Sequence, residues 1–599
     1  MAGPMGGGPM RGAHKEPMKV KNKKLTFKKL LQELKIVKWQ VISVLILTVL
    51  SVILSIYTPK ITEKAITELF NTFIGLPIDL NLVATILLTA GSLYLISTVF
   101  NIISRYIMGT TSQTLVYSLR KRVREKIDKV PLKYYDENST GDLISRVTND
   151  LDNIGMTLNQ SITQVFSSIL TVVGVVIMMF TINIWLTFIS LVTLPLSVIV
   201  AGLFVKRTQK YFAGQAKDLG DLSDIVEETY TNQKTVKAYN KEKATLKEFI
   251  KRNDDLKKAS EKANFFSGMI FPFINFINNF GYIVVTIFAS VFIANRSLDP
   301  GYLVVFLQYS SQLTQPIGQM AQLSSTIQTL LASSERVFEV LEQAEEVEDS
   351  VTSVEVDKFK GDVTFKKVQF GYDEKLLMKN VNFDVKQGNL IALVGPTGAG
   401  KTTIVNLIMR FYELNGGSII IDNKNITDYK RKSLRKNIGM VLQDTWLFNG
   451  TIKENIAYGK KDATMEEIIE ASKLAQAHHF IQTLPHGYET VINEATNNIS
   501  EGQKQLLTIA RAILANPQIL ILDEATSSVD TRTEILIQTA FENLMKNKTS
   551  FVIAHRLSTI QNADMIFVMN YGDIIEQGSH NELLDKKGFY YELYNSQFV

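Results

Sequence analysis

The sequence predicts an α-helical membrane domain of six spans, fused to a cytoplasmic α/β domain with a phosphate-binding loop. Long uncharged apolar segments gather in the first half of the chain, as membrane helices require. From Gly361 onward, short β-rich runs alternate with helical stretches. A glycine-rich loop at residues 395–402 lies between a predicted strand and a predicted helix. The fold class follows from the order of these segments.

Length, cysteine content and net charge exclude several classes of function. A chain of 599 residues is too long for a single core and predicts at least two domains. The absence of cysteine excludes disulfides, thiolate catalysis and zinc–sulfur sites. A formal net charge of +5 is small for this length, so we expect no nucleic-acid partner.

Six segments of the first half are long enough to cross a lipid bilayer, and none contains Asp, Glu, Lys or Arg. In lipid, a helix satisfies every backbone polar group within one segment. The alternative is a set of buried core helices in a soluble protein. Six uncharged segments of this length fit that alternative poorly. The predicted spans are residues 39–57, 80–103, 161–182, 184–204, 265–294 and 302–323.

Positive charges predict the orientation of the chain. Lys and Arg cluster before the first span, between spans two and three, and between spans four and five. By the positive-inside rule these parts face the cytoplasm, and an even number of spans returns the chain to that side. We therefore predict a multi-pass protein of the inner (cytoplasmic) membrane, with a bacterial cell as its setting and its second half in the cytoplasm.

The domain boundaries follow from the same patterns. Residues 1–20 are rich in glycine and proline, which predicts a disordered tail. Residues 21–38 form a predicted amphipathic helix on the inner membrane surface, or else a simple helical lead-in to the first span. We then expect the six-helix domain at 39–335 with two long cytoplasmic loops, a linker at 336–360 and the nucleotide-binding domain at 361–599.

The glycine-rich loop matches the full pattern G-x-x-x-x-G-K-[ST] in its required setting. A buried strand is predicted at 391–394 before it and a helix at 403–409 after it. Glycines let backbone N–H groups approach phosphates, and the helix N-terminus favours an anion. In this pattern Lys401 reaches the β- and γ-phosphates, while the Thr402 hydroxyl ligates Mg²⁺. The predicted cofactors are ATP and Mg²⁺.

A second buried strand, Ile519–Asp523, is predicted to end in a carboxylate that is followed directly by Glu524. An acidic residue beside a phosphate loop is well placed to hold Mg²⁺, directly or through water. Glu524 is then placed to orient or deprotonate an attacking water molecule. The alternative, a solvated pair at a strand end, fits less well with the apolar run that precedes it.

The segment from Ile499 to Gln503 resembles the signature motif of ATP-binding cassettes. With six preceding spans, the chain resembles a bacterial multidrug-type ABC exporter half-transporter, and the likeness covers nearly all of it after residue 20. The resemblance implies a role for Tyr372 in stacking on adenine, Gln443 as the Q-loop residue, Asp530 in the D-loop and His555 as the switch histidine. It also implies that residues 134–146 and 227–239 belong to the loops that carry closure of the cassettes to the membrane helices.

The expected site residues fall into three groups. The catalytic pair is Glu524 and His555, and the metal-binding set is Thr402, Gln443 and Asp523. The nucleotide-binding residues expected from the motifs are Tyr372, Gly395, Pro396, Thr397, Gly398, Ala399, Gly400, Lys401, Thr402, Thr403, Gln443, Ser500, Glu501, Gly502, Gln503 and Asp530.

One position departs from the family pattern. The usual signature has glycine where this chain has Glu501, and a carboxylate beside a triphosphate is repulsive. In the family, the signature of one cassette faces the phosphate loop of the other. The departure therefore predicts a heterodimer in which this chain is the subunit with the catalytic carboxylate, and a different half-transporter supplies a regular signature. The alternative is a homodimer that tolerates Glu501.

The resemblance implies ATP hydrolysis coupled to export by alternating access. Aromatic and amide side chains of the fifth and sixth spans suit hydrophobic or amphipathic small molecules, although such amides also bond between helices. A lipid flippase, a peptide exporter and a non-transporting regulatory subunit are alternatives within this family. A soluble chromosome- or repair-type cassette ATPase is a further alternative, which the apolar spans disfavour.

Overall fold

The structure is a computed structural model that describes residues 22–73, 77–443, 445–492, 499–523, 529–554 and 557–598. The chain divides into two compact units. The helical unit comprises residues up to Val130 and Asn138–Ala344, and the α/β unit comprises Pro131–Glu137 and Glu345–Val599. The predicted tail at 1–20 lies outside the described residues.

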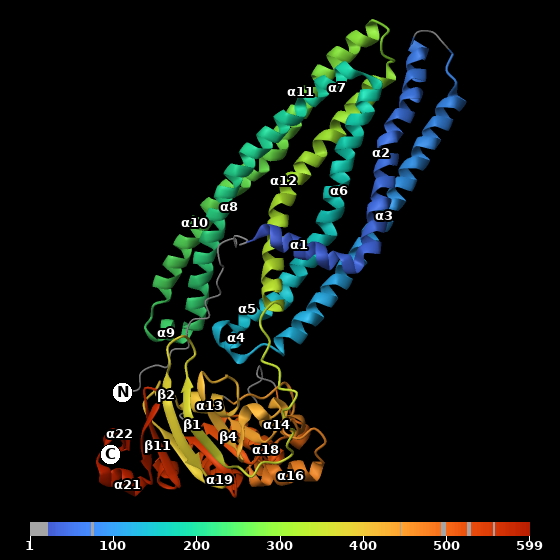
Figure 1. Ribbon diagram of the computed structural model, residues 1–599. Helices are drawn as coiled ribbons and strands as arrows, with labels where there is room; N and C mark the ends of the chain where they lie inside the picture. Colours follow the sequence, from blue (N-terminus) through green and yellow to red (C-terminus); the bar gives the residue numbers. More distant parts are fainter. Residues whose placement is uncertain are drawn as a thin grey trace. The chain divides into compact units, whose positions relative to one another are not determined.

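The helical unit consists of long antiparallel helices joined by short connections (Figure 1). Its 3₁₀ turn is η1 (Lys35–Val37), and η2 (Arg146–Asp150) is a single π-helical stretch. The α-helices are α1 (Lys23–Leu34), α2 (Lys38–Phe73), α3 (Leu80–Ile127), α5 (Thr140–Ser145), α6 (Leu151–Ile182), α7 (Ile184–Leu191), α8 (Thr193–Thr231), α9 (Gln233–Ala238), α10 (Glu242–Gly268), α11 (Ile270–Ala294) and α12 (Gly301–Leu341).

Five helices among the described residues are long and apolar enough to cross a membrane. They run over Lys23–Phe70, Leu80–Ile127, Thr140–Ile182, Ile184–Thr231 and Glu242–Ala294. The predicted sixth span, 302–323, is helical as part of α12 but is not among the five. Its five glutamines (Gln308, Gln312, Gln315, Gln319 and Gln322) make it more polar than the others. By apolarity, five of the six predicted spans are therefore found among the described residues, and the sixth is present as a more polar helix.

Hydroxyl groups join the membrane helices internally. The Ser51 and Ser97 hydroxyls lie 3.0 Å apart between α2 and α3, and those of Thr48 and Ser104 lie 3.2 Å apart. The Tyr309 hydroxyl donates to the Ile56 carbonyl at 2.8 Å. Such bonds hold helices together where lipid offers no hydrophobic driving force.

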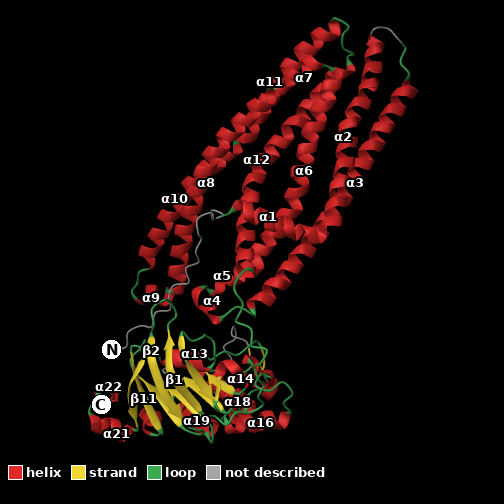
Figure 2. Cartoon of the chain, in the orientation of Figure 1, coloured by secondary structure: helices red, strands yellow, loops and turns green. Residues whose placement is uncertain are grey.

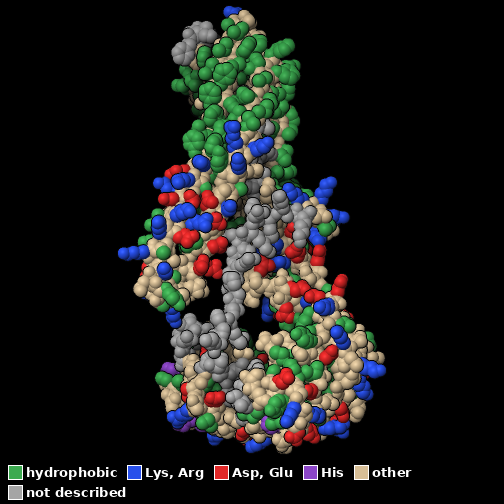
Figure 3. All heavy atoms as spheres, turned by 90° about the vertical axis from the view of Figure 1, so that its left-hand side faces the viewer, with side chains coloured by type: hydrophobic (Ala, Val, Ile, Leu, Met, Phe, Trp, Pro, Cys, Tyr) green, Lys and Arg blue, Asp and Glu red, His purple; other side chains and the backbone are tan. Residues whose placement is uncertain are grey.

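The outer surface of the helical unit changes character along its length. One face shows a hydrophobic surface over one part of the helices and clustered charges over the other part (Figure 3). On α11, large apolar side chains are exposed every three or four residues, at Phe276, Phe280, Ile283 and Ile287. This periodic exposed stripe suits contact with lipid or with another helix.

The first helix packs on the rest of the helical unit. In α1, Leu30 is buried, whereas Leu25, Phe27 and Leu31 are exposed. Glu33 pairs with Arg122 of α3 at 2.7 Å, which fixes α1 against the bundle. Its role as a helix on the membrane surface stays a prediction.

The α/β unit contains three sheets surrounded by short helices (Figure 2). A four-stranded antiparallel sheet has the order β2-β1-β4-β5, a mostly parallel six-stranded sheet has the order β12-β11-β3-β10-β9-β6, and β7 pairs with β8. The strands are β1 (Val363–Phe370), β2 (Met378–Val385), β3 (Leu390–Val394), β4 (Gly416–Ile421), β5 (Lys424–Asn425), β6 (Ile438–Val441), β7 (Gly450–Thr451), β8 (Val491–Ile492), β9 (Ile519–Asp523), β10 (Thr549–Ile553), β11 (Met565–Asn570) and β12 (Asp573–Gly578).

The helices of this unit are mostly short. Two 3₁₀ turns, η3 (Ile426–Asp428) and η4 (Gly487–Glu489), accompany them. The α-helices are α4 (Leu132–Glu137), α13 (Lys401–Ile408), α14 (Arg431–Lys436), α15 (Ile452–Ala457), α16 (Met465–Leu474), α17 (His478–Thr483), α18 (Glu501–Ala515), α19 (Thr531–Met545), α20 (Leu557–Gln561), α21 (His580–Lys586) and α22 (Phe589–Phe598).

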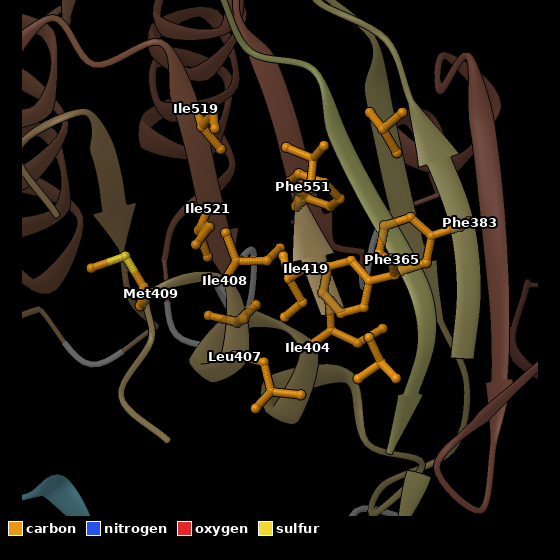
Figure 4. Close-up of a cluster of buried hydrophobic side chains, with 14 of the residues drawn as sticks. Phe365, Phe383, Ile404, Leu407, Ile408, Met409, Ile419, Ile519, Ile521 and Phe551 are labelled. Carbon is orange, nitrogen blue, oxygen red and sulfur yellow. The ribbon is translucent and has the colours of Figure 1, made fainter. Parts of the chain in front are cut away.

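The largest core of the α/β unit lies between the antiparallel sheet and α13 with the parallel strands. Phe365 and Phe383 stack with ring centroids 4.2 Å apart, and Ile404 and Ile408 of α13 are fully buried beside them (Figure 4). Burial of each such side chain contributes about 1.5–3 kcal/mol. This packing fixes the start of α13, and therefore the glycine-rich loop, against the sheet.

The predicted linker at 336–360 does not form a separate segment. The helix α12 continues to Leu341, past the predicted boundary at residue 335. Beyond Glu345 the chain packs on the α/β unit, where Asp349 pairs with Arg431 at 3.0 Å and Phe359 is buried in the core. The residues after the helix therefore belong to the α/β unit.

Candidate nucleotide site

The phosphate loop has the predicted strand–loop–helix structure. Strand β3 ends at Val394, and α13 begins at Lys401. Gly398 and Gly400 have φ angles of +82° and +100°, a region that side chains other than glycine rarely occupy. A Cβ atom at Gly395 would lie 2.3 Å from the Met569 carbonyl oxygen. The glycines therefore allow both the turn and its close approach to β11.

The side chain of Lys401, the first residue of α13, folds back onto this loop. Its ammonium donates to the Gly395 carbonyl at 2.6 Å and to the Pro396 carbonyl at 3.1 Å. Burial lowers the pKa of Lys401, and the nearby carboxylate of Asp523 partly offsets that effect. A half-buried cation beside exposed backbone at a helix N-terminus is a favourable site for a polyphosphate.

The sheet brings the other motifs to the same edge. In the strand order, β3 and β9 lie on either side of β10, with β6 beyond β9, and all four are parallel. Their carboxyl ends therefore carry the phosphate loop, Asp523 and Gln443 along one edge. Glu524 directly follows β9 and His555 follows β10, but both residues lie outside the described part of the chain, so their assigned roles stay predictions.

The donors present fit a magnesium ion held together with phosphates. Thr402 is exposed at the start of α13, and Asp523 is the last residue of β9, which is separated from β3 by β10. Among the described residues, no group of three or more His, Cys, Asp or Glu side chains gathers at a metal-binding distance. Mg²⁺ that arrives with a nucleotide needs only one or two protein ligands, because phosphates and water complete its shell.

Tyr372 lies beside the phosphate-loop helix. Its hydroxyl and that of Thr403 are 3.1 Å apart, and its ring meets Phe370 and Tyr412 edge-on, with centroids 5.0 and 5.1 Å away. The exposed fraction of Tyr372 is 38%, so part of the ring remains free to stack on a base.

The signature segment forms the first turn of α18. Ser500 caps the helix: its hydroxyl accepts from the Gln503 N–H at 3.3 Å, and the Gln503 side chain accepts from the Ser500 N–H at 2.9 Å. Gly502 is buried against α19, where an added Cβ would lie 2.5 Å from the Thr533 methyl carbon. Gly502, the one glycine of this segment, is therefore required by packing inside this chain.

Glu501 has a partner that sequence reasoning missed. Its carboxylate pairs with the Lys504 ammonium at 2.7 Å, and 62% of its side chain is exposed. The spacing i,i+3 on a helix could have predicted this pair. Glu501 also lies at the helix N-terminus, where a carboxylate is favourable for this helix itself.

Asp530 caps the next helix. Its carboxylate accepts from the Thr533 N–H at 3.0 Å at the start of α19, and backbone hydrogen bonds lower its pKa. Its membership of the D-loop, which the family resemblance implies, stays a prediction. The cap fixes Asp530 at the start of α19.

A phosphate loop at the edge of a parallel sheet, joined in one chain to several membrane helices, defines a membrane-bound P-loop ATPase. Residues 40–317 match the family model for the ABC transporter transmembrane region, and residues 378–527 match the ABC transporter model. The chain belongs to the ABC transporter family, as an exporter half-transporter whose ATPase domain lies in the cytoplasm.

The similarity to known proteins extends over almost the whole chain. An uncharacterized ABC transporter ATP-binding protein, YfiC, of Bacillus subtilis is 42% identical over 98% of this chain and 96% of its own length. A fatty acid ABC transporter ATP-binding/permease protein of Mycobacterium bovis is 43% identical over 87% of this chain and 83% of its own. A solved bacterial Atm1-family ABC exporter with ATP bound superposes with a TM-score of 0.75 at 27% identity, over 94% of this chain and 99% of the other.

These findings confirm the fold class, the coupling of an ATPase to transport, and the multi-pass membrane location. They also confirm the prediction that the chain is an ABC exporter half-transporter, and they imply ATP binding and the pairing of two halves. The heterodimer, the substrate and the individual site residues stay predictions.

Proposed function

We propose that this chain exports hydrophobic or amphipathic small molecules across the cytoplasmic membrane, as the catalytically competent half of a heterodimer. The observation that carries the proposal is the juxtaposition of Lys401, Asp523 and the phosphate loop at one edge of the sheet, in a chain with apolar membrane helices. ATP binding would supply the energy for switching the membrane helices between two states, since a ligand shifts an equilibrium only by binding two states differently.

In this proposal each site residue has a distinct task. Lys401 leaves its two loop carbonyls for the β- and γ-phosphates, and Thr402 with Asp523 and Gln443 holds Mg²⁺. Tyr372 stacks on the base. Glu524 orients the attacking water, and His555 contacts the γ-phosphate, as the family resemblance implies.

The heterodimer is supported by the charge on the first turn of α18. If a second copy docked against this signature, its ATP would meet the exposed Glu501 carboxylate. Lys504 offsets part of this charge, but the pair as a whole presents no net attraction for a triphosphate. A partner with glycine at this position would offer the bare helix N-terminus to the ATP that is bound by this chain.

The substrate class is supported by the polarity of α11 and α12. Gln308, Gln315 and Asn275 are exposed in the single chain and carry no charge. Other amides are occupied: Asn278 accepts from the Thr314 hydroxyl at 3.1 Å, and Gln319 bonds to Gln164. Uncharged amides among aromatic side chains suit an amphipathic ligand better than an ion.

Lipid export is a second candidate. The mycobacterial relative is named as a fatty acid ABC transporter, and a fatty acid combines an apolar chain with one polar end. The exposed amides and phenylalanines of α11 suit such a molecule as well as a drug-like compound.

The test is ATP-dependent uptake into inside-out proteoliposomes that hold this chain with and without candidate partner halves. A hydrophobic cationic dye and a labelled long-chain fatty acid serve as separate probes, and Lys401→Met is the matched inactive control. Uptake of either probe that needs both ATP and Lys401 supports the proposal and tells the two substrate classes apart. ATP hydrolysis that never moves either probe, with any partner, contradicts export of this class.

A further inference from the structure

The tip of the first predicted cytoplasmic loop forms part of the α/β unit. Helix α4 belongs to this unit, although the chain on both sides of it belongs to the helical unit. The Lys133 ammonium donates to the Tyr372 carbonyl at 2.9 Å and lies 4.0 Å from the Asp373 carboxylate. It also lies 3.6 Å from Glu137 of its own helix. One side chain of α4 therefore holds the backbone of the residue proposed to stack on adenine.

A second contact from α4 reaches the same tyrosine through its neighbour. The Asp136 carboxylate accepts a hydrogen bond from the Tyr412 hydroxyl. Burial and the Asp136 charge raise the pKa of Tyr412, so the phenol stays protonated and remains the donor. The Tyr412 ring in turn meets the Tyr372 ring edge-on at an interplanar angle of 87°.

The two contacts fix different parts of Tyr372. Lys133 holds its backbone, while its ring packs edge-on against the rings of Tyr412 and Phe370. Its hydroxyl meets Thr403, two residues after Lys401 on the phosphate-loop helix. Tyr372 therefore lies between α4 on one side and the start of α13 on the other.

We propose that Lys133 and Asp136 are positioning residues for the nucleotide: they hold Tyr372 in register to stack on the base. The inference rests on the proposed function, because it takes Tyr372 to be the base-stacking residue. Neither side chain touches the phosphates, so their effect falls on the affinity for the base-bearing part of ATP. By linkage, nucleotide binding must strengthen the binding of α4 to the rest of the α/β unit by the same factor.

The expected magnitude follows from the exposure of each contact. Lys133 is about half exposed (47%), so its loss should raise the Kd for ATP only about threefold. The bond between Tyr412 and Asp136 joins a phenol to a carboxylate, but Asp136 is also exposed, so its loss should raise the Kd only about three- to fivefold.

The experiment compares Lys133→Met, Asp136→Ala and Tyr412→Phe in the full chain, reconstituted in lipid nanodiscs. Equilibrium binding of a fluorescent ATP analogue is measured alongside displacement by ATP and by inorganic tripolyphosphate. Tripolyphosphate occupies the phosphate loop but has no base, so it reports damage to the loop separately. We expect ATP to bind more weakly to each variant and tripolyphosphate to bind with wild-type affinity.

Three further variants, one of them a control, make the test more specific. Asp136→Ala combined with Tyr412→Phe should be no worse than the stronger single change, because both remove the same hydrogen bond. Lys133→Arg should retain most of the ATP affinity, since the guanidinium can still donate to the carbonyl. The exposed Lys424→Met on β5 is the charge-matched control and should bind ATP as the wild type does.

Unchanged ATP affinity in all three variants, with a wild type that binds ATP, would overturn the positioning role. An equal loss of affinity for ATP and tripolyphosphate would also overturn it, because the change would then act on the phosphate loop as a whole. A wild-type chain that binds neither ligand would instead contradict the proposed nucleotide site, and the two failures are thereby told apart.

Discussion

Replacing Gly502 by alanine sets two effects of opposite sign against each other in α18. Alanine favours a helix over glycine by about 1 kcal/mol, which alone would stabilise the chain. The added Cβ, however, would lie 2.5 Å from the Thr533 methyl carbon and 2.9 Å from a Val529 methyl carbon. Both neighbours are β-branched and stiff at χ1, so α19 itself must shift.

Overpacking of this kind costs about 1–3 kcal/mol, and contacts this short place the cost in the upper part of that range. The net loss should then be about 1–2 kcal/mol, which lowers the thermal midpoint of the α/β unit by about 3–6 °C. Because Asp530 caps α19 beside the displaced residues, ATP turnover should fall as well.

The assay is thermal unfolding of the full chain in detergent, followed by circular dichroism, with ATPase activity measured on the same samples. Glu501→Gln is the matched control for the thermal midpoint only, because its side chain is exposed on the same helical turn. Gly502→Ala combined with Thr533→Ala removes the methyl group and should recover most of the lost stability. A Gly502→Ala chain that is as stable as the wild type, or more stable, would refute the steric argument.

Three further predictions concern the α/β unit. Lys401→Met should abolish binding of a fluorescent ATP analogue, because the loop loses the cation that meets the phosphates; retained binding would contradict its role. Glu524→Gln should remove most ATPase activity and leave ATP binding intact, and near-normal turnover would rule it out as the base. Burial, together with the nearby charge of Lys358, lowers the pKa of Lys548 to about 8, whereas a lysine in the unfolded chain has a pKa of about 10.4. Between these two pH values the unfolded state binds more protons than the folded state, so the stability of the fold rises with pH over this range. Lys548→Met should therefore raise the thermal midpoint at pH 7, and this advantage over the wild type should shrink by pH 10.5; an advantage independent of pH would contradict the burial argument.

Much of the nucleotide site could be predicted because its motifs are local in sequence. The phosphate loop and β9 each combine a buried strand with a loop of fixed chemistry, and the structure has both where expected. The strand–loop pattern around each residue was enough to predict that Asp523 lies near Lys401, because the carboxyl ends of parallel strands meet at one edge of a sheet.

Other features depend on contacts between distant residues, which a single sequence does not reveal. The attachment of α4 to the α/β unit joins Asp136 to Tyr412 across a long stretch of chain. The packing of Asp349 on Arg431 likewise converts a predicted linker into part of that unit. The ion pair between Glu501 and Lys504 could have been predicted from the sequence, since it depends only on helical spacing.

The sixth span illustrates how composition and structure can differ. The glutamines of α12 lower its apolarity below that of the other membrane helices, yet Val305, Phe306 and Tyr309 are fully buried in the helical unit. Packing against neighbouring helices therefore holds α12 in place, where hydropathy alone is insufficient.

The most direct test of the central claim is the Mg²⁺-dependent ATPase activity of this chain purified alone in lipid, beside Glu501→Gly and Glu501→Gln. If an unsuitable signature limits the homodimer, the wild type should hydrolyse ATP slowly, and both variants should gain activity as the carboxylate is removed and Lys504 is freed. Robust activity of the wild type, unchanged in either variant, would mean a working homodimer and would contradict the asymmetric heterodimer.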